Sequence, residues 1–230
     1  MLPQRWLVPL GKGSTKNDIE LMYMLRGLAK HHPEAEPLVI GEKPIWYKGE
    51  HIPYTDDVTG VKENNIRLKV LHYCKLNPCT QFVFSNDDHF LLAPFSGRNY
   101  YQHTLAYFSG LCFGGIYKQC IDNTIRVCGA QFPYYDVHTP IIIDSDLFIQ
   151  HLSDEWRKTS CCVMKTIYAY RSQLVGTPYV DAGLKSPHDI HEIRALLDGR
   201  IMFTINDPVA MTQGLMRYFA ETYPVKSRWE

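Results

Sequence analysis

The segment Gln81–Leu92, "QFVFSNDDHFLL", combines a buried strand with a pair of acids. Its first part, "QFVFS", is a short and nearly continuous apolar run, which is typical of a strand covered on both faces of a sheet. Asp87 and Asp88 follow side by side, and a second apolar run comes directly after them. Because adjacent carboxylates repel each other and are costly to bury, their place at the end of such a strand needs a cause.

The flanking sequence predicts strands that alternate with helices. Apolar runs at Arg5–Leu10 and Glu36–Gly41 favour two further strands. The residues from 17 to 32 and from 62 to 76 carry apolar side chains at helical spacing. Strands alternating with helices predict an α/β fold, with a Rossmann-like, mainly parallel sheet flanked by helices.

The rest of the chain is less regular. Residues 94–136 are rich in aromatic residues and glycine with weak periodicity, so we expect loops and short strands that form a small irregular lobe on the acceptor side. Further helices are expected at 144–152, at 162–175, and from an N-cap at Ser186. A last strand at 200–207 and a closing helix at 210–223 complete a single domain over 1–230, in which 94–136 is an insertion.

Composition excludes several classes of protein. The 24 Lys and Arg balance the 24 Asp and Glu, which argues against a broad nucleic-acid surface. No apolar run is long enough to span a membrane, and the first residues lack the apolar core of a secretory signal, so a soluble, cytoplasmic protein is expected. The seven cysteines show no CxxC spacing and are expected to be reduced, mostly buried thiols.

Acids at the end of a strand suggest a metal site. Ligands of doubly wound sheets bind beyond the carboxyl ends of the strands, where acids commonly hold a divalent cation that binds phosphate. Asp87, Asp88 and Asp207, which ends the strand-like run "RIMFTIND", are the candidate metal ligands. A solvated turn at Asp87-Asp88 and a helix cap at Asp207 are the alternatives.

Other polar residues are candidates for catalysis and substrate binding. His138, in "YYDVHTP", could act as a general base or donate to a phosphate, although a lone histidine is more often structural. The turn "GKGST" before a helix could hold phosphate, although it lacks the spacing of an established motif. The candidates for substrate binding are Gly11, Lys12, Gly13, Ser14, Arg26, Asn64 and Asn86.

Several of these residues together resemble the Stealth family of sugar-phosphate transferases. That family includes bacterial capsule polymerases and the N-acetylglucosamine-1-phosphotransferase that tags lysosomal enzymes. "NDIELMYMLRGLAKHHPEAEPLVIGEKPIW" followed by "FVFSNDDHFLL" is similar to the longest block of that family, and "VHTPIIIDSDLF" to its H-x-P block. "FTINDPVAMTQGLMRYFAETYPVKSRWE" is similar to its last block, with the terminal run "PVKSRWE". The blocks occur in the order of the family and span most of the chain. The matching positions are Asn17, Glu20, Leu21, Tyr23, Leu25, Arg26, Asn86, Asp87, Asp88, His138, Pro140, Asn206 and Asp207.

The resemblance implies a nucleotide-sugar transferase fold of the GT-A-like kind in a compact form, with Mg²⁺ or Mn²⁺ as cofactor. It implies the transfer of a sugar-1-phosphate from a nucleotide sugar, most simply a UDP-sugar, to an acceptor hydroxyl on a glycan. His138 and Asp88 would be catalytic.

The chain also departs from the family pattern. "WLVPLGKGS" carries no acid where the family has one, and Met22 stands in place of an arginine. Two alternatives therefore stay open. One is a glycosyltransferase that moves only the sugar to a glycan or to a hydroxymethylated DNA base, as a phage-encoded enzyme could. The other is a non-catalytic module that binds a sugar or nucleotide.

Overall fold

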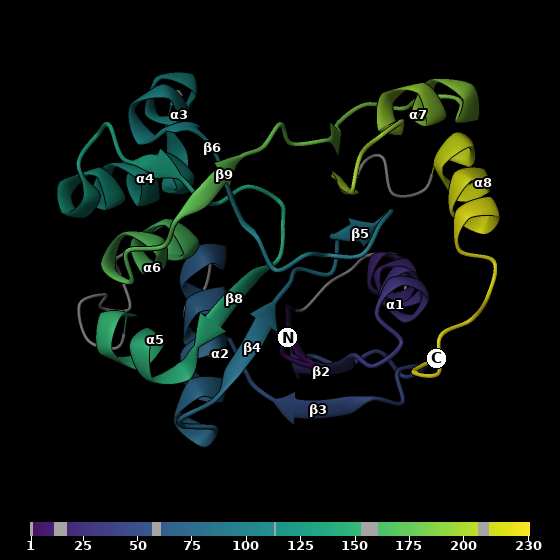
Figure 1. Ribbon diagram of the computed structural model, residues 1–230, viewed down its shortest axis with the longest axis horizontal. Helices are drawn as coiled ribbons and strands as arrows, with labels where there is room; N and C mark the ends of the chain where they lie inside the picture. The colour runs from purple at the N-terminus through teal and green to yellow at the C-terminus, as the bar shows by residue number, and fades with distance from the viewer. Residues whose placement is uncertain (1, 12–17, 57–60, 113, 153–160, 207–211) are drawn as a thin grey trace.

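The computed structural model describes residues 2–11, 18–56, 61–112, 114–152, 161–206 and 212–230. A five-stranded sheet forms its centre, in the order β3-β2-β1-β4-β8 (Figure 1). The strands are β1 (Arg5–Leu10), β2 (Glu36–Gly41), β3 (Glu50–Pro53), β4 (Gln81–Phe84) and β8 (Ile141–Asp144). The first four are parallel to their neighbours and β8 is antiparallel to β4. This arrangement confirms the predicted Rossmann-like, mainly parallel α/β sheet.

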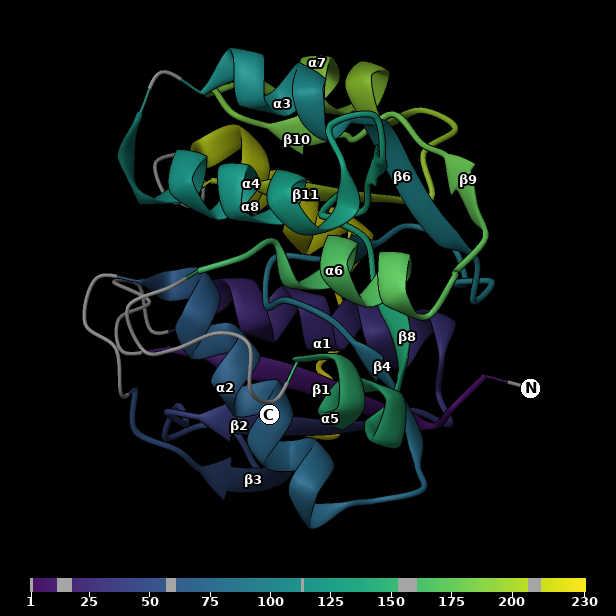
Figure 2. The same cartoon turned by 90° about the vertical axis from the view of Figure 1, so that its left-hand side faces the viewer.

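Helices cover both faces of the sheet because side chains alternate along its strands. Trp6 and Val8 of β1 belong to a core shared with α1 (Ile19–His31), whereas Leu7 belongs to a second core shared with α2 (Lys62–Leu76). The helices α5 (Ser145–Leu152) and α6 (Met164–Arg171) contribute to the α2 side (Figure 2). The helices α1 and α2 lie where the sequence predicts them.

The C-terminal part of the chain extends the α1 side. A three-stranded sheet in the order β10-β11-β5 lies there with two helices. Its elements are β5 (Phe90–Leu91), β10 (Gly183–Leu184), β11 (Met202–Ile205), α7 (Ile190–Leu197) and α8 (Gln213–Thr222). The ring of Tyr23 on α1 stacks on Phe219 of α8 with 4.3 Å between centroids. Burial of these aromatic rings helps to hold α8 against α1.

A separate lobe holds the segment expected to be irregular. It comprises β6 (Asn99–Thr104), α3 (Leu105–Leu111), α4 (Gly115–Cys128), β7 (Pro133–Tyr134) and β9 (Gly176–Pro178), with the strands in the order β7-β6-β9. The prediction of loops and short strands alone over 94–136 was therefore wrong. Only Leu105 of α3 is buried, while Tyr107 and Leu111 are exposed on the other side of the helix. Because apolar residues therefore lie on both sides of α3, the sequence shows no clear helical period there.

Three further expectations need correction. The strand β3 is not among the strands expected from the sequence, and it pairs with β2. The helix α7 is capped by Asp189 rather than by Ser186, because Asp189 and Glu192 form a reciprocal capping box. Cys120 and Cys161 form a disulfide rather than remaining reduced. Within the described ranges, no helix has the length and apolarity to cross a membrane.

Candidate active site

The segment Asn86-Asp87-Asp88 lies at the point where the strand order of the central sheet reverses. Strands β1 and β4 are parallel neighbours, and β2 and β3 follow β1 on one side while β8 follows β4 on the other. The amide of Ser85 still donates to the carbonyl of Leu7 at 3.0 Å, so the chain leaves the sheet just before Asn86. Such a switch point is where open α/β sheets form their ligand crevice.

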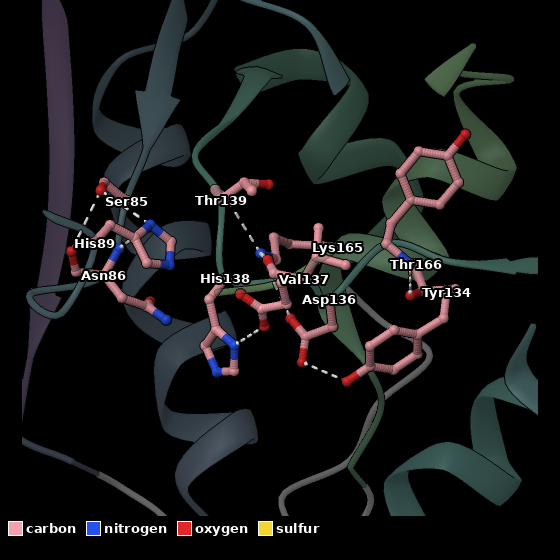
Figure 3. Close-up of polar contacts among 12 residues, drawn as sticks. Ser85, Asn86, His89, Tyr134, Asp136, Val137, His138, Thr139, Lys165 and Thr166 are labelled. Atoms are coloured by element: carbon pink, nitrogen blue, oxygen red, sulfur yellow. Dashed lines mark hydrogen bonds and ion pairs between the residues drawn. The ribbon is translucent and has the colours of Figure 1, made fainter. Parts of the chain in front are cut away.

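The two acids are held in a tight turn by the histidine that follows them. The Nδ1 atom of His89 lies 3.3 Å from the amide of Asn86 and 3.2 Å from the hydroxyl of Ser85 (Figure 3). His89 is buried, and this burial lowers its pKa well below the ordinary range, so its ring is neutral and accepts through Nδ1. The turn is therefore closed by buried polar contacts, which a simple solvated turn does not need.

Asp87 and Asp88 have too little positive charge around them to offset the cost of burying two carboxylates. Burial, and next the negative charge of Asp88, raise the pKa of Asp87 to about 7. Burial also raises the pKa of Asp88, against the opposing charges of His138 and Lys62. The Oδ1 atom of Asp88 is enclosed and has no hydrogen-bond partner in the described structure.

These features fit a divalent cation, because oxygen ligands with uncompensated charge are what Mg²⁺ and Mn²⁺ bind. In the part of the chain that the structure describes, no cluster of three or more His, Cys, Asp or Glu side chains is arranged to hold a metal. Asp87 and Asp88 supply two carboxylates, and Asp207, the third predicted ligand, lies outside the described residues. A cation bound to the pair would therefore take its other ligands from water, from a phosphate-bearing substrate, or from Asp207.

A histidine and an aspartate form a dyad close to these acids. The Nδ1 atom of His138 lies 2.5 Å from Oδ2 of Asp181. Burial lowers the pKa of His138, but the hydrogen bond and charge of Asp181, together with the charge of Asp88, more than offset it, so the pKa is raised overall. The same pairing lowers the pKa of Asp181 despite its burial. Asp181 is therefore ionised and accepts from Nδ1, which leaves Nε2 of His138 as the atom available to a substrate.

A buried lysine fixes the segment that carries His138. The Nζ atom of Lys165, on α6, donates to the carbonyls of Val137 and Thr139, which flank the histidine in sequence (Figure 3). Burial lowers the pKa of Lys165, and the nearby charges of Asp136, Asp181 and Asp88 oppose that shift. These two hydrogen bonds, one on each side of His138 in sequence, hold the backbone that carries its ring.

Asn86, His138 and Asp181 border one cleft, with a volume of about 620 Å³. Its polar lining includes Lys62, Asn86, Asp136, His138, Asp181 and Lys185. Its aromatic lining includes His103, Tyr107, Phe108, Tyr117 and Tyr134, which come from the lobe. The cleft therefore has one wall at the edge of the sheet and one wall on the lobe.

The structure brings some of the predicted site residues together. Asn86 and His138 line the same cleft, and Asp88 is close enough to His138 for each charge to act on the pKa of the other. Gly11 follows β1 directly, at the same edge of the sheet. Lys12, Gly13 and Ser14 lie outside the described residues.

Two predicted substrate ligands have other partners. The guanidinium of Arg26 makes a two-pronged ion pair with Glu230, with Nε to Oε1 at 2.9 Å and Nη2 to Oε2 at 2.7 Å. Asn64 is buried and accepts from Arg67 within α2. Both side chains support the fold, so neither is retained as a ligand for phosphate or sugar.

The sequence alone missed several residues of the site. Asp181 is 43 residues from His138, and no local pattern joins the two. Lys62 and Lys185 are exposed cations at the ends of elements and look like solvated surface residues until the cleft is seen. Lys165 did leave a signal, because it is a lone charge inside the apolar run "CVMKTIYAY".

No known family model matches the sequence, and no curated protein is similar enough to count as a relative. Solved structures of similar shape include the glycosyltransferase GlyE of Streptococcus pneumoniae TIGR4, at 8% identity and a TM-score of 0.47 over 98% of this chain. This chain spans 61% of the length of that structure.

Two others have lower TM-scores. A glycosyltransferase involved in glycosylation of the major capsid of PBCV-1 is 11% identical, with a TM-score of 0.41 over 97% of this chain and 100% of its own. Mouse xyloside xylosyltransferase 1 is 9% identical, with a TM-score of 0.42 over 90% of this chain and 99% of its own.

Proposed function

We propose that this chain is a transferase that uses a nucleotide sugar and a divalent cation, and that passes a sugar or a sugar-1-phosphate to an acceptor hydroxyl. One observation carries the proposal. Asn86, which directly precedes the buried acids Asp87 and Asp88 at the switch point of a parallel sheet, lines the same cleft as His138, which is oriented by Asp181, and Asp88 is close enough to His138 to raise its pKa. An acid pair suits a metal and diphosphate, and an oriented histidine suits proton transfer from a hydroxyl.

The donor would bind at the edge of the sheet. A divalent cation held by Asp87 and Asp88 would neutralise charge on the diphosphate of the nucleotide sugar. Lys62 and Lys185, which are exposed and line the cleft, would bind further phosphate oxygens as point charges. The resemblance of the Asn86-Asp87-Asp88 segment to sugar-phosphate transferases supports the same assignment.

His138 would act as the general base. Because Nδ1–H of His138 donates a hydrogen bond to Asp181, the lone pair on Nε2 is free to take the proton of the acceptor hydroxyl. The acceptor oxygen then forms a bond to the donor, and the leaving phosphate carries away the electron pair of the bond that breaks. Asp181 holds the tautomer and stabilises the imidazolium that forms, as the carboxylate of a catalytic triad does.

Two reactions share this scheme and differ in the bond that breaks. In sugar-1-phosphate transfer the acceptor attacks the phosphorus next to the sugar, and a nucleoside monophosphate leaves. In glycosyl transfer the acceptor attacks the anomeric carbon, and a nucleoside diphosphate leaves. The order of the sequence motifs favours the first reaction, and the lack of an acid after β1 favours the second.

The test is a by-product assay. The full chain is incubated with UDP-sugars and GDP-sugars, with Mg²⁺ or Mn²⁺ and a panel of hydroxyl acceptors, and released nucleotides are separated by chromatography. We expect acceptor-dependent release of UMP if sugar-phosphate moves, or of UDP if only the sugar moves. Release of neither from any donor would refute the transferase proposal, and metal-free binding of a nucleotide sugar without turnover would favour the non-catalytic module.

Two finer expectations belong to the same proposal. A glycan is the proposed acceptor, and a hydroxymethylated DNA base is the competing one, which the same assay includes as an oligonucleotide. A cytoplasmic location also stays a proposal. The Cys120–Cys161 disulfide weighs against it, because disulfides are rare in reducing compartments.

A further inference from the structure

The wall of the cleft on the lobe carries a column of exposed apolar and aromatic side chains. His103, Tyr107 and Leu111 are spaced four residues apart and all line the cleft. The ring of Tyr107 is 47% exposed, and Leu111 is 54% exposed. Tyr107 and Leu111 fall on one face of α3, which the helix presents to the cleft, while Leu105 on its opposite face is buried. His103 comes just before the helix, on β6.

The column is held rigidly although it is exposed. The rings of His103 and Tyr107 stack with 4.0 Å between centroids and 23° between planes. Phe108 lies edge-on to Tyr107 and stacks on Tyr134 of β7 at 4.0 Å. A ring fixed in this way loses little conformational freedom when a ligand stacks on it, which is what makes a good binding platform.

A polar group lies between this platform and the dyad. The carboxylate of Asp136 accepts from the hydroxyl of Tyr117 at 3.0 Å, and Tyr134 lies within 3.5 Å of the same oxygen. Asp136 is two residues before His138, and Figure 3 shows both side chains on the same side of the segment, with the hydroxyl of Tyr134 beside Asp136. Within the described ranges, the other carboxylate oxygen of Asp136 lies 3.9 Å from Nζ of Lys165 and accepts no hydrogen bond, so it is available to a ligand hydroxyl.

We infer that the lobe wall is the acceptor subsite and that it takes a saccharide, whose ring stacks on Tyr107 while a hydroxyl is held by Asp136 next to His138. This inference rests on the proposed function. A pyranose has an apolar C–H face and a rim of hydroxyls, which match an exposed ring and a carboxylate acceptor. A nucleobase would also stack, but a nucleic-acid strand brings phosphates toward Asp136 and Asp181, which repel them.

The test compares Tyr107→Ala with Tyr107→Phe and with Tyr170→Ala. Tyr170 is a matched control because it is 41% exposed on α6 and packs against Phe132, outside the cleft lining of the described residues. Lactose, maltose and N,N′-diacetylchitobiose serve as acceptors in the nucleotide-release assay. Their binding without donor is measured by saturation-transfer NMR.

Tyr107→Ala should raise the KM for the saccharide about 10-fold, with a smaller change in the KM for the donor, because one stacked ring is lost. Tyr107→Phe should restore the KM to within about threefold, because the ring remains. Tyr170→Ala should resemble the wild type. Thermal unfolding of each variant shows whether a change comes from misfolding.

The inference fails if Tyr107→Ala binds the saccharides as the wild type does, if it raises the donor KM as much as the acceptor KM, or if only hydroxymethylated DNA serves as acceptor. These outcomes differ from failure of the proposed function, in which the wild type releases no nucleotide from any donor. NMR signals from saccharides that depend on Tyr107 would still support the subsite in that case.

Discussion

The two walls of the cleft are built in different ways. The sheet wall is the end of β4 beside β1, where a regular parallel ladder fixes the direction in which Asn86-Asp87-Asp88 leaves the sheet. The lobe wall is a seven-residue helix, α3, attached through Leu105 and a few stacked rings. The sheet wall offers charge and the lobe wall offers aromatic surface.

This difference indicates a division of labour. Charge compensation for a diphosphate requires carboxylates and lysines at fixed distances, which a packed sheet edge provides. An acceptor is recognised by shape and hydroxyls, and a small lobe can change its surface without disturbing the sheet. We therefore expect substitutions on the sheet wall to abolish the reaction and changes in the lobe only to adjust it.

The largest effect is expected for Asp88→Asn. The substitution removes one charge of the acid pair with almost no change in volume, so the proposed cation would lose a ligand. We expect turnover to fall about 10³-fold or more, the order seen when an essential electrostatic contact is removed. Nucleotide release at saturating acceptor is the measurement, and Asp198→Asn, an exposed acid outside the cleft lining of the described residues, is the control.

A slightly smaller effect is expected for His138→Gln. Glutamine can still donate a hydrogen bond toward Asp181 but cannot take up a proton. Loss of general-base catalysis lowers kcat about 10²–10⁴-fold. Donor affinity should change little, and calorimetric titration with a non-hydrolysable nucleotide sugar checks this. A kcat within threefold of the wild type would remove His138 from the mechanism.

Asp181→Asn should change both the rate and its pH dependence. Base catalysis needs the neutral imidazole, so kcat/KM rises with pH through the pKa of His138, which Asp181 raises. Without that carboxylate the pKa falls, and the ascending limb of kcat/KM should move to lower pH. The plateau should drop about 10–100-fold because the imidazolium is less stabilised. If the ascending limb of kcat/KM did not move, the group that titrates would not be His138.

The smallest effect on turnover is expected for the disulfide of the lobe. The bond joins Cys120 on α4 to Cys161, over a separation of 41 residues. Reduction, or replacement of both residues by alanine, should lower the free energy of unfolding by about 3–4 kcal/mol. Turnover at 25 °C should fall less than threefold, because the acids and the dyad lie elsewhere. Cys79→Ala, which removes an exposed free thiol, is the control in urea unfolding.

The sheet could be predicted from the sequence because β1, β2 and β4 are short apolar runs and α1 and α2 repeat at helical spacing. The acids at Asp87 and Asp88 could be placed at its edge for the same reason. The partner of His138 could not, because Asp181 is 43 residues away and meets it only in the folded chain. Arg26 matched a family pattern, yet its ion pair with Glu230 is a tertiary contact that no local pattern reveals.

Donor binding is the direct test for a cation held by Asp87 and Asp88. The affinity of UDP and of UDP-sugars is measured by titration calorimetry for the wild type and for Asp88→Asn, each with Mn²⁺ and with EDTA. We expect binding by the wild type with Mn²⁺, and binding at least 10-fold weaker with EDTA or in Asp88→Asn. Equal affinity under all four conditions, or no binding by the wild type, would contradict a metal-dependent nucleotide-sugar site at the end of β4.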